Sequence, residues 1–306
     1  MAIKQVRAKI NNVWTTLTYN QSTGNYEATI TAPNITSYNV NSGHYYPVTI
    51  EATNMAGTVT TADDTHASLG SNLKLKVKEK TAPVVAISAP TASSYLATNT
   101  PEISFTITDE TNGSGVDISS LKIKVDSATY TNASTGVTVT AITNGKSVKF
   151  IPQTALSDGS HTVTITCSDY DGNEGSKSVT FTVDTVAPTL TVTAPAENGL
   201  YVATSAYSVV GTTNDVTSSV ASVSVKVNGV DQGAVTVDSS GAFSKAVNLS
   251  SGANTIVVTA TDRAGKTTTI TRTINLDTSA PEITLISVTP NPVETGGTFV
   301  ISVKVV

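Results

Sequence analysis

Alternating apolar and polar residues are the dominant pattern along this chain. Residues 163–167 place Val, Ile and Cys at every second position, and the same alternation occurs in 48–52 and in 256–260. A period of two is typical of a strand that buries one face, so each stretch is predicted to be a half-buried β-strand. We expect almost no helix, because Val and Thr dominate these stretches and β-branched side chains favour strands.

An internal repeat organises these strands. Residues 156–169 recur as 249–262, with every position shifted by 93, and the register continues through the strand that follows. Such a long shared register indicates two copies of one structural unit. A third, more diverged copy begins at residue 43 and contains about ten extra residues, 61–70, which are predicted to form a longer loop.

Each copy has the same kind of turn after its alternating strand. The turns are 54–58, 169–173 and 262–266; each begins with Asn or Asp and has Gly at its fourth position. Asn and Asp start turns by bonding to their own backbone, and Gly supplies a positive φ. Each copy is therefore expected to contain a β-hairpin.

Proline marks the ends of the copies, because it cannot donate to a strand ladder. Pro83, Pro188 and Pro281 each precede a new alternating strand by one or two residues. We predict an all-β chain of tandem immunoglobulin-like β-sandwiches arranged as an elongated rod, since short proline-containing linkers limit swinging. The predicted modules span 1–80, which is a possible docking module, then 84–186, 189–279 and the partial module 282–306.

The last segment, 282–306, contains two predicted strands around a Pro- and Gly-rich turn. Two strands do not form a stable core alone. The segment is expected to be either the start of a fourth module that is cut short or a hairpin that joins another sheet by strand addition.

Composition and charge remove several classes of function. The formal charge of −5 is spread thinly, and no basic stretch is suited to nucleic acid. No segment has the apolar length of a membrane span, and the first residues lack the hydrophobic block of a signal peptide. The single cysteine, Cys167, excludes an internal disulfide and a thiolate metal cluster.

Two motifs resemble a known family. Residues 260–265, Ala-Thr-Asp-Arg-Ala-Gly, and 276–281, Leu-Asp-Thr-Ser-Ala-Pro, are similar to the tandem bacterial Ig-like (Big-type) domains of bacteriophage tail proteins and bacterial surface adhesins. The resemblance implies a sandwich fold and a role as spacer, stalk or ligand binder. In the phage setting it implies extension or decoration of a virion, with weak contact to carbohydrate.

Candidate catalytic residues fit structural roles better. His44 and His161 lie at the start of equivalent strands, and the third copy has Asn254 at that place. A catalytic base is not exchanged for Asn, so these are interpreted as turn residues. Cys167 aligns with alanines on the buried side of its strand and is predicted to fill the core. We therefore expect no enzyme activity.

Calcium at the joints between modules is the stronger hypothesis. The turn at 169–173 is not an EF-hand, because Gly and Glu are missing at the sixth and twelfth loop positions. If the hairpin turns point toward the preceding module, Asp169 and Asp171 face Glu79, and Asp262 faces Asp184. These carboxylates are possible ligands of a shared Ca²⁺. The alternative is that they only cap turns and solvate linkers.

Large aromatic side chains are rare and lie mainly in the first module. Trp14, Tyr45 and Tyr46 have no equivalents later in the chain. Exposed Trp and Tyr commonly stack on sugar rings, so these three residues are predicted to make docking or ligand contacts.

The sequence therefore favours a non-enzymatic structural protein of a virion, such as a phage tail. Its expected partners are other particle or cell-surface proteins, further copies of itself, and glycan. The missing signal peptide and sorting motif favour a particle over a surface adhesin. The alternatives are a fragment of a secreted adhesin, or a carbohydrate-binding accessory region of a larger extracellular enzyme.

Overall fold

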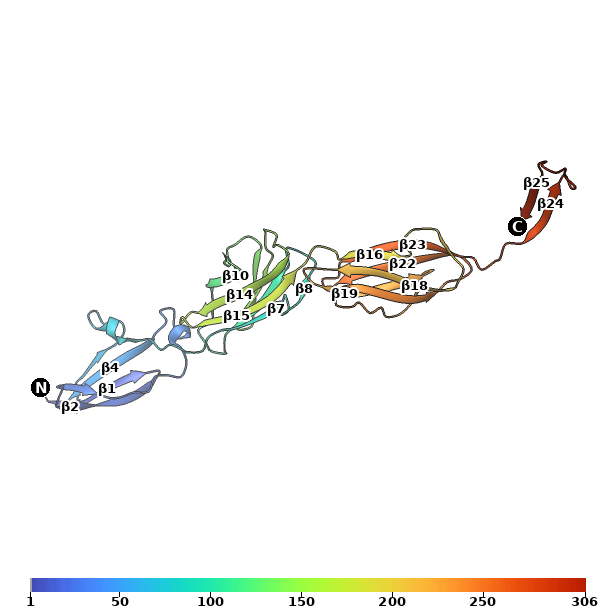
Figure 1. Cartoon of the computed structure of the whole chain (residues 1–306). Helices are drawn as coiled ribbons and strands as arrows, with labels where there is room; N and C mark the ends of the chain where they lie inside the picture. Colours follow the sequence, from blue (N-terminus) through green and yellow to red (C-terminus); the bar gives the residue numbers. More distant parts are fainter. Residues whose placement is uncertain (1) are drawn as a thin grey trace. The chain divides into compact units, whose positions relative to one another are not determined.

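The computed structural model describes residues 2–306, and its regular elements are β-strands and two short 3-10 helices, η1 (Ser37–Asn39) and η2 (Gly70–Leu73). The all-β prediction is confirmed. In the described range no helix is long and apolar enough to cross a bilayer. The chain divides into two compact units, Met1–Asp184 and Thr185–Val306. Figure 1 labels strands of both units. The prediction of an elongated rod stays a prediction.

Residues 2–80, called module 1 below, form one six-stranded sheet. Its central part is ordered β3-β2-β1-β4-β5, and β6 pairs with β4 beyond the end of β5. Of the extra residues predicted as a loop, 61–62 end β5, and the others form a loop that leads into η2 and then β6. The strands are β1 (Ile3–Ile10), β2 (Val13–Asn20), β3 (Asn25–Glu27), β4 (Tyr46–Asn54), β5 (Val59–Ala62) and β6 (Lys74–Leu75).

Module 1 differs from the sandwich expected for 1–80. Its described residues contain no second packed sheet, and their buried apolar side chains are Ala8 and Tyr46. Ile30 of the irregular segment 28–36 borders the same hollow as Ile10 of β1. Alternation predicts a strand with one protected face, but it does not say whether a sheet or irregular chain protects that face.

Module 2 is a two-sheet sandwich within Val84–Val183. One sheet has the order β11-β10-β14-β15-β8 and the other β12-β13-β9-β7. Fifteen buried residues between them form one core, which includes Phe105, Phe150 and Phe181. The strands are β7 (Val84–Ala89), β8 (Tyr95–Leu96), β9 (Ile103–Thr108), β10 (Val116–Val125), β11 (Ala128–Tyr130), β12 (Val137–Ile142), β13 (Gly145–Phe150), β14 (Gly159–Asp169) and β15 (Glu174–Val183).

Module 3 repeats this architecture within Thr189–Leu276. Its sheets have the orders β16-β18-β21 and β17-β23-β22-β19-β20, and they enclose a core of thirteen buried residues. The strands are β16 (Thr189–Ala194), β17 (Leu200–Val202), β18 (Ala206–Asn214), β19 (Val220–Val227), β20 (Val230–Asp231), β21 (Ala242–Asn248), β22 (Gly252–Asp262) and β23 (Thr267–Leu276).

Modules 2 and 3 share an immunoglobulin-like feature at their first strand. The chain begins on one sheet as β7 or β16 and then crosses to the other sheet. There β8 pairs in parallel with β15, and β17 pairs in parallel with β23. All other neighbouring strands in these modules pair antiparallel, as expected for an immunoglobulin-like sandwich.

Residues 282–306 form a separate hairpin of β24 (Ile283–Thr289) and β25 (Val300–Val305). The two strands pair with each other in a two-stranded sheet, and every residue of both is exposed. The predicted strands are present. The two alternatives for this hairpin, the start of a further module and the completion of another sheet, both stay predictions.

Candidate functional site

The three repeated turns have nearly identical geometry, which explains why their first residue is Asn or Asp. In each turn, Oδ1 of the first residue accepts the N–H of the fifth, at 2.9 Å for Asn54, 2.9 Å for Asp169 and 2.8 Å for Asp262. The glycine at the fourth position has φ of 85°, 94° and 87° in chain order. The side-chain bond fixes the carboxylate of Asp169 at the tip of the β14–β15 hairpin.

Asp109 comes to the same end of module 2 from the opposite sheet. It directly follows β9, and its side chain is buried. Its Oδ2 accepts the backbone N–H of Gly115 at 2.7 Å. The intervening Gly113 has no room for a side chain, because a Cβ there would lie 2.5 Å from Asp109 Oδ2 and 3.0 Å from Glu79 Oε2. The loop therefore folds closely around the two carboxylates.

Glu79 reaches this loop from the end of module 1. Its Oε1 accepts the backbone N–H of Ser114, and its own backbone N–H donates to Asp171 Oδ2 at 3.1 Å. Both bonds connect module 1 to module 2 inside the first compact unit. The prediction that Glu79 faces the 169–173 turn therefore matches the geometry of the joint.

Glu79, Asp109 and Asp169 together form a carboxylate cluster, named the joint cluster below. One oxygen of each lies within 4.8 Å of one oxygen of each of the others. Glu79 Oε2 and Asp109 Oδ1 are buried and have no hydrogen-bond partner. Like charges at this separation repel, and unpaired buried carboxylate oxygens are costly. A bound cation or a proton on one carboxyl would reduce this repulsion.

The pKa of Glu79 also indicates that the joint cluster disfavours ionised carboxylates. Burial raises the pKa of Glu79, and the neighbouring Glu110 carboxyl raises it further, against hydrogen bonds from Ser114 that lower it. A raised carboxyl pKa means that the environment disfavours the ionised form. A divalent cation that prefers oxygen ligands would reverse this preference, and Ca²⁺ is such a cation. Three carboxylates give part of its six to eight oxygens, so carbonyls or water would supply the rest.

Asp171, also predicted as a ligand, has a different role from Asp169. Its Oδ2 accepts a hydrogen bond from Thr36 Oγ1 at 2.5 Å as well as the one from Glu79 N–H. Its carboxylate therefore holds module 1 in place and is not part of the cluster. Asp109 was not predicted, because it belongs to no repeated motif. Its signal was an acidic residue directly after a strand, in the Gly-rich loop 109–115.

Further contacts surround the joint cluster. The Tyr38 ring of module 1 stacks between His44 and Tyr170, with ring centroids 4.1 Å and 4.6 Å away and interplanar angles of 8° and 10°. Asn39 Nδ2 donates to Gly113 O at 2.6 Å, and Lys78 Nζ donates to Asp171 O at 2.9 Å. The carboxylates therefore lie in a polar and aromatic interface that fixes both modules.

The predicted partner carboxylates Asp184 and Asp262 belong to different compact units. Within the second unit, Asp262 has a carboxylate oxygen within 4.8 Å of one of Asp215. Asp215 Oδ1 accepts three backbone N–H groups, from residues 217–219, at 3.0, 2.7 and 2.9 Å. The pairing of Asp184 with Asp262 across the joint stays a prediction.

The three aromatic residues predicted for docking have different environments. Tyr46 is buried and its hydroxyl donates to Ile35 O at 3.1 Å, so it is a packing residue and not an exposed platform. The Tyr45 hydroxyl donates to Asp64 Oδ2 at 2.8 Å, and Lys74 Nζ lies 4.9 Å from its ring centroid. Trp14 is 36% exposed and lies on the face of the sheet that carries Arg7.

The histidine at the start of β14 is part of a structural pair. His161 Nδ1 lies 2.7 Å from Asp126 Oδ2, and Nε2 lies 2.7 Å from the carbonyl oxygen of Ser157. In module 3 the same places hold Asn254 and Asn228, joined by a 3.0 Å bond from Asn228 Nδ2 to Asn254 Oδ1. The second ring nitrogen of His161 is bonded to a main-chain carbonyl, so it has no nucleophile to activate.

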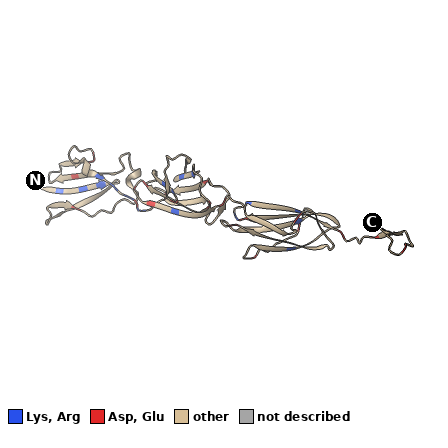
Figure 2. Ribbon diagram, turned by 45° about the horizontal axis from the view of Figure 1, so that its top comes forward, with Lys and Arg blue, Asp and Glu red and all other residues tan. Residues whose placement is uncertain are grey.

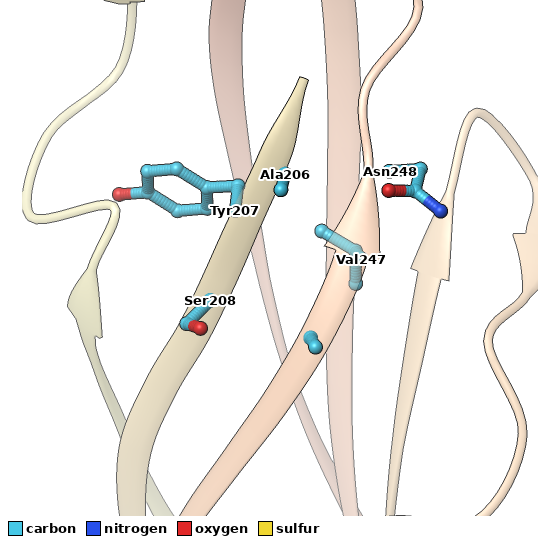
Figure 3. Close-up of a pocket in the computed structure, with 6 residues that line it drawn as sticks. Ala206, Tyr207, Ser208, Val247 and Asn248 are labelled. Carbon is cyan, nitrogen blue, oxygen red and sulfur yellow. The ribbon is translucent and has the colours of Figure 1, made fainter. Parts of the chain in front are cut away.

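Other candidate reactive positions have ordinary packing roles. Cys167 is 1% exposed, and burial raises the pKa of its thiol, as expected for core filler. A hollow of about 220 Å³ between β18 and β21 is lined by six residues that include Tyr207 and Asn248, and it contains no carboxylate, His or Cys (Figure 3). Burial raises the pKa of the Tyr207 hydroxyl. This hollow therefore has no group for acid–base chemistry at neutral pH.

Comparisons with known proteins agree with the observed module boundaries. Residues 80–185 match the family model described as a bacterial Ig-like domain, and residues 188–278 match the model described as glucodextranase, domain B. The two matches coincide with modules 2 and 3. The comparison with curated proteins gave no match.

Three solved structures are similar to this chain with low TM-scores. Fibronectin(III)-like modules of Clostridium thermocellum CbhA are 17% identical, with 63% of this chain and 94% of that chain covered and a TM-score of 0.39. A bacterial ice-binding adhesin is 22% identical (89% and 86% covered, TM-score 0.31). A tetra-tandem repeat from the extending region of a large adhesion protein is 20% identical (98% and 80% covered, TM-score 0.34). The fold assignment rests on the sheets and the family models. Residues 80–185 are similar to a bacterial Ig-like domain, and modules 2 and 3 are two Ig-like β-sandwiches in tandem.

Proposed function

We propose that this chain is a non-enzymatic structural and presentation protein that acts outside the cytoplasm, most specifically as a component that extends from or decorates a phage tail or a related particle. Tandem Ig-like modules support this role because such folds serve as spacers and binding platforms.

The observation that carries the proposal is the joint cluster. A spacer transmits position only if its joints are stiff, and contacts between domains are otherwise expected to permit motion. A divalent cation held by Glu79, Asp109 and Asp169 would connect the last residues of module 1 to both sheets of module 2. The cation would thereby set the direction in which module 1 is presented.

A second candidate function is favoured by one specific observation. Residues 188–278 match a domain model from glucodextranase, whose name refers to a polysaccharide. The chain would then be an accessory region of a larger secreted protein, or part of an adhesin, that holds that protein near a glycan. Both candidate functions place the chain outside the cytoplasm and use its modules as supports.

Location distinguishes these proposals from an intracellular role. Immuno-electron microscopy with an antibody to module 3 should label intact particles or intact cell surfaces of the source. Label on particle tails supports the first candidate, and label on cell walls supports the second. Label confined to the interior of cells would overturn both.

Cation binding is tested by calorimetric titration of Ca²⁺ into metal-free protein. We expect one site in unit 1 to bind and to stabilise it, by about 2.7 kcal/mol when free Ca²⁺ is about 100 times Kd. Asp109→Asn should abolish this binding because it removes one ligand charge from the cluster. Without Ca²⁺, the same variant should be at least as stable as the wild type, because repulsion among the carboxylates is reduced.

The matched control is Glu102→Gln, which removes an exposed carboxylate that pairs with Lys149 at 3.1 Å far from the joint. This control should keep full Ca²⁺ binding. Equal Ca²⁺ binding by wild type and Asp109→Asn would show that the joint cluster holds no cation.

A further inference from the structure

Charge is distributed unevenly between module 1 and the rest of the chain. Residues 1–80 contain seven Lys and Arg but five Asp and Glu, whereas residues 81–306 contain eleven and eighteen. Module 1 therefore carries a formal charge of +2 within a chain of formal charge −5. Figure 2 shows Lys and Arg in blue along the strands nearest the N-terminus. An anionic partner is attracted to this part of the chain.

One face of the module 1 sheet presents these charges together with the single tryptophan. Lys9 of β1 lies between Trp14 of β2 and Thr49 of β4 in the strand register, so the three side chains leave the sheet on the same face. Arg7 belongs to the next row of this face, opposite Glu51. We name Arg7, Lys9, Trp14 and Thr49 the basic face.

The two cations of the basic face are held differently. Arg7 makes an ion pair with Glu51, with its guanidinium nitrogen 2.6 Å from the carboxylate, and lies 4.2 Å from the Trp14 ring centroid. Lys9 Nζ lies 5.4 Å from the same ring centroid. Among residues 2–306, no carboxylate forms an ion pair with Lys9. The charge of Arg7 is therefore balanced inside the protein, and that of Lys9 is available to a ligand.

A hollow adjoins Lys9 on the side away from Trp14. Its volume is about 290 Å³, and Lys9, Asn11, Asn12, Pro47 and Thr49 are among its lining residues. This size is near the lower end of small-ligand pockets. The hollow combines an ammonium group, amides and a hydroxyl, and Lys9 lies between Thr49, which lines it, and the partly exposed indole of Trp14.

We propose that the basic face and this hollow bind an anionic saccharide, a sugar chain whose residues carry carboxylate groups. A carboxylate pairs with Lys9 Nζ, the apolar face of a sugar ring packs on Trp14, and neighbouring hydroxyls bond to the amides and to Thr49. This inference rests on the proposed function, in which module 1 is presented outside the cell, and it names the chemical class of the ligand.

The test uses the whole chain, with Ca²⁺ present, and isothermal titration with three acidic probes: oligogalacturonate, oligo-alginate and sialyllactose. Neutral cello-oligosaccharides and lactose are the matched uncharged probes. We expect at least one acidic probe to bind about tenfold more tightly than its neutral counterpart, since a hydrogen bond to a charged group is worth on the order of a tenfold change or more. Added salt should weaken this binding.

Two variants locate the site. Lys9→Gln should reduce affinity for the acidic probe about tenfold, and Trp14→Ala should reduce it for acidic and neutral sugars alike. Lys124→Gln, an exposed strand lysine of module 2, should leave affinity unchanged. Circular dichroism melts show whether each variant folds. If Lys9→Gln does not fold, Lys9→Arg takes its place, and this variant should retain binding because it keeps the charge.

Failure of this inference is distinct from failure of the proposed function. If no acidic probe binds better than its neutral counterpart, or if Lys9→Gln binds as the wild type does, the saccharide proposal is overturned even when the protein labels particle or cell surfaces. If the basic face captures an acidic protein from surface extracts and no acidic sugar, the inference is also overturned.

Discussion

At the scale of single residues, equivalent positions of modules 2 and 3 connect the same two neighbouring strands through different side chains. His161 and Asp126 join the start of β14 to the end of β10, while Asn254 and Asn228 do this in module 3 through neutral amides. The main-chain N–H that follows each strand start is bonded alike, Thr162 to Asp126 Oδ1 and Thr255 to Asn228 Oδ1. Only the pair in module 2 can gain or lose charge near neutral pH.

This difference predicts that module 2 alone has pH-dependent stability from this position. Although burial opposes both effects, the pairing raises the pKa of His161 and lowers the pKa of Asp126. The raised histidine pKa gives stability below about pH 6.5 that is lost as pH rises through the folded value. The lowered carboxyl pKa gives stability above about pH 4 that is lost as pH falls through the folded value. The contribution is therefore greatest between about pH 4 and 6.5.

The measurement is the free energy of unfolding of module 2, obtained by chemical denaturation at several pH values inside and outside the window of about pH 4 to 6.5. The double variant Asp126→Asn with His161→Asn installs the pair found in module 3. It should flatten the pH dependence of the module 2 transition and leave the module 3 transition unchanged. An unchanged pH profile in the double variant would show that other groups cause the dependence.

At the scale of elements, the chain that enters each sandwich contacts one position of the last strand. In module 2 this position is Gly175, where an added Cβ would lie 1.9 Å from the carbonyl oxygen of Pro83. The residue shifted by 93 is Thr268, whose hydroxyl donates to the carbonyl oxygen of Pro188 at 2.5 Å. Module 2 therefore brings the entering chain into direct backbone contact, whereas module 3 holds it through a side chain.

Gly175→Ala should consequently destabilise module 2 by about 1–3 kcal/mol, the usual cost of forcing extra atoms into a packed site. The measurement is the denaturant midpoint of the module 2 transition. Ser176→Ala, at the exposed neighbouring position, is the control and should change stability little. A Gly175→Ala variant as stable as the wild type would mean that the entering chain moves aside without cost.

Hairpins were predictable from the sequence because they depend on local rules. The alternation in 163–167 and the Asp-to-Gly turn at 169–173 appear in the structure as β14 and its hairpin, since period and turn chemistry act over a few residues. The same local pattern in 48–52 predicted β4, but it did not reveal that module 1 has a single sheet. The number of layers depends on contacts distant in sequence.

The candidate site was predictable only in part, for the same reason. Glu79 and Asp169 were found because they flank a repeated boundary and a repeated turn. Asp109 joins them through the pairing of β9 with β13 and β7 in the opposite sheet, which no local motif reports. Tyr46 was misread as exposed because its neighbours Tyr45 and Pro47 are polar or turn residues, and strand alternation turns Tyr46 alone to the buried face.

At the scale of the whole molecule, stability is expected to be uneven along the chain. Modules 2 and 3 each have a core of more than ten buried residues, whereas module 1 has Ala8 and Tyr46. Burial of apolar surface is the main stabilising contribution in such domains, and local opening follows its absence. Module 1 therefore depends on its joint with module 2 for part of its order.

Hydrogen exchange of the full chain measures this dependence directly. Amides of β1 and β4 should exchange faster than those of β14 and β22, because their strands lie in a sheet without a packed partner. Ca²⁺ should slow exchange in module 1 of the wild type, since any ligand that binds only the closed joint adds to the cost of opening it. Asp109→Asn should remove the slowing while β22 stays unaffected. If the amides of module 1 exchanged as slowly as those of module 3 with and without Ca²⁺, module 1 would be stable without help from the joint. The joint cluster would then act on the direction of module 1 and not on its folding.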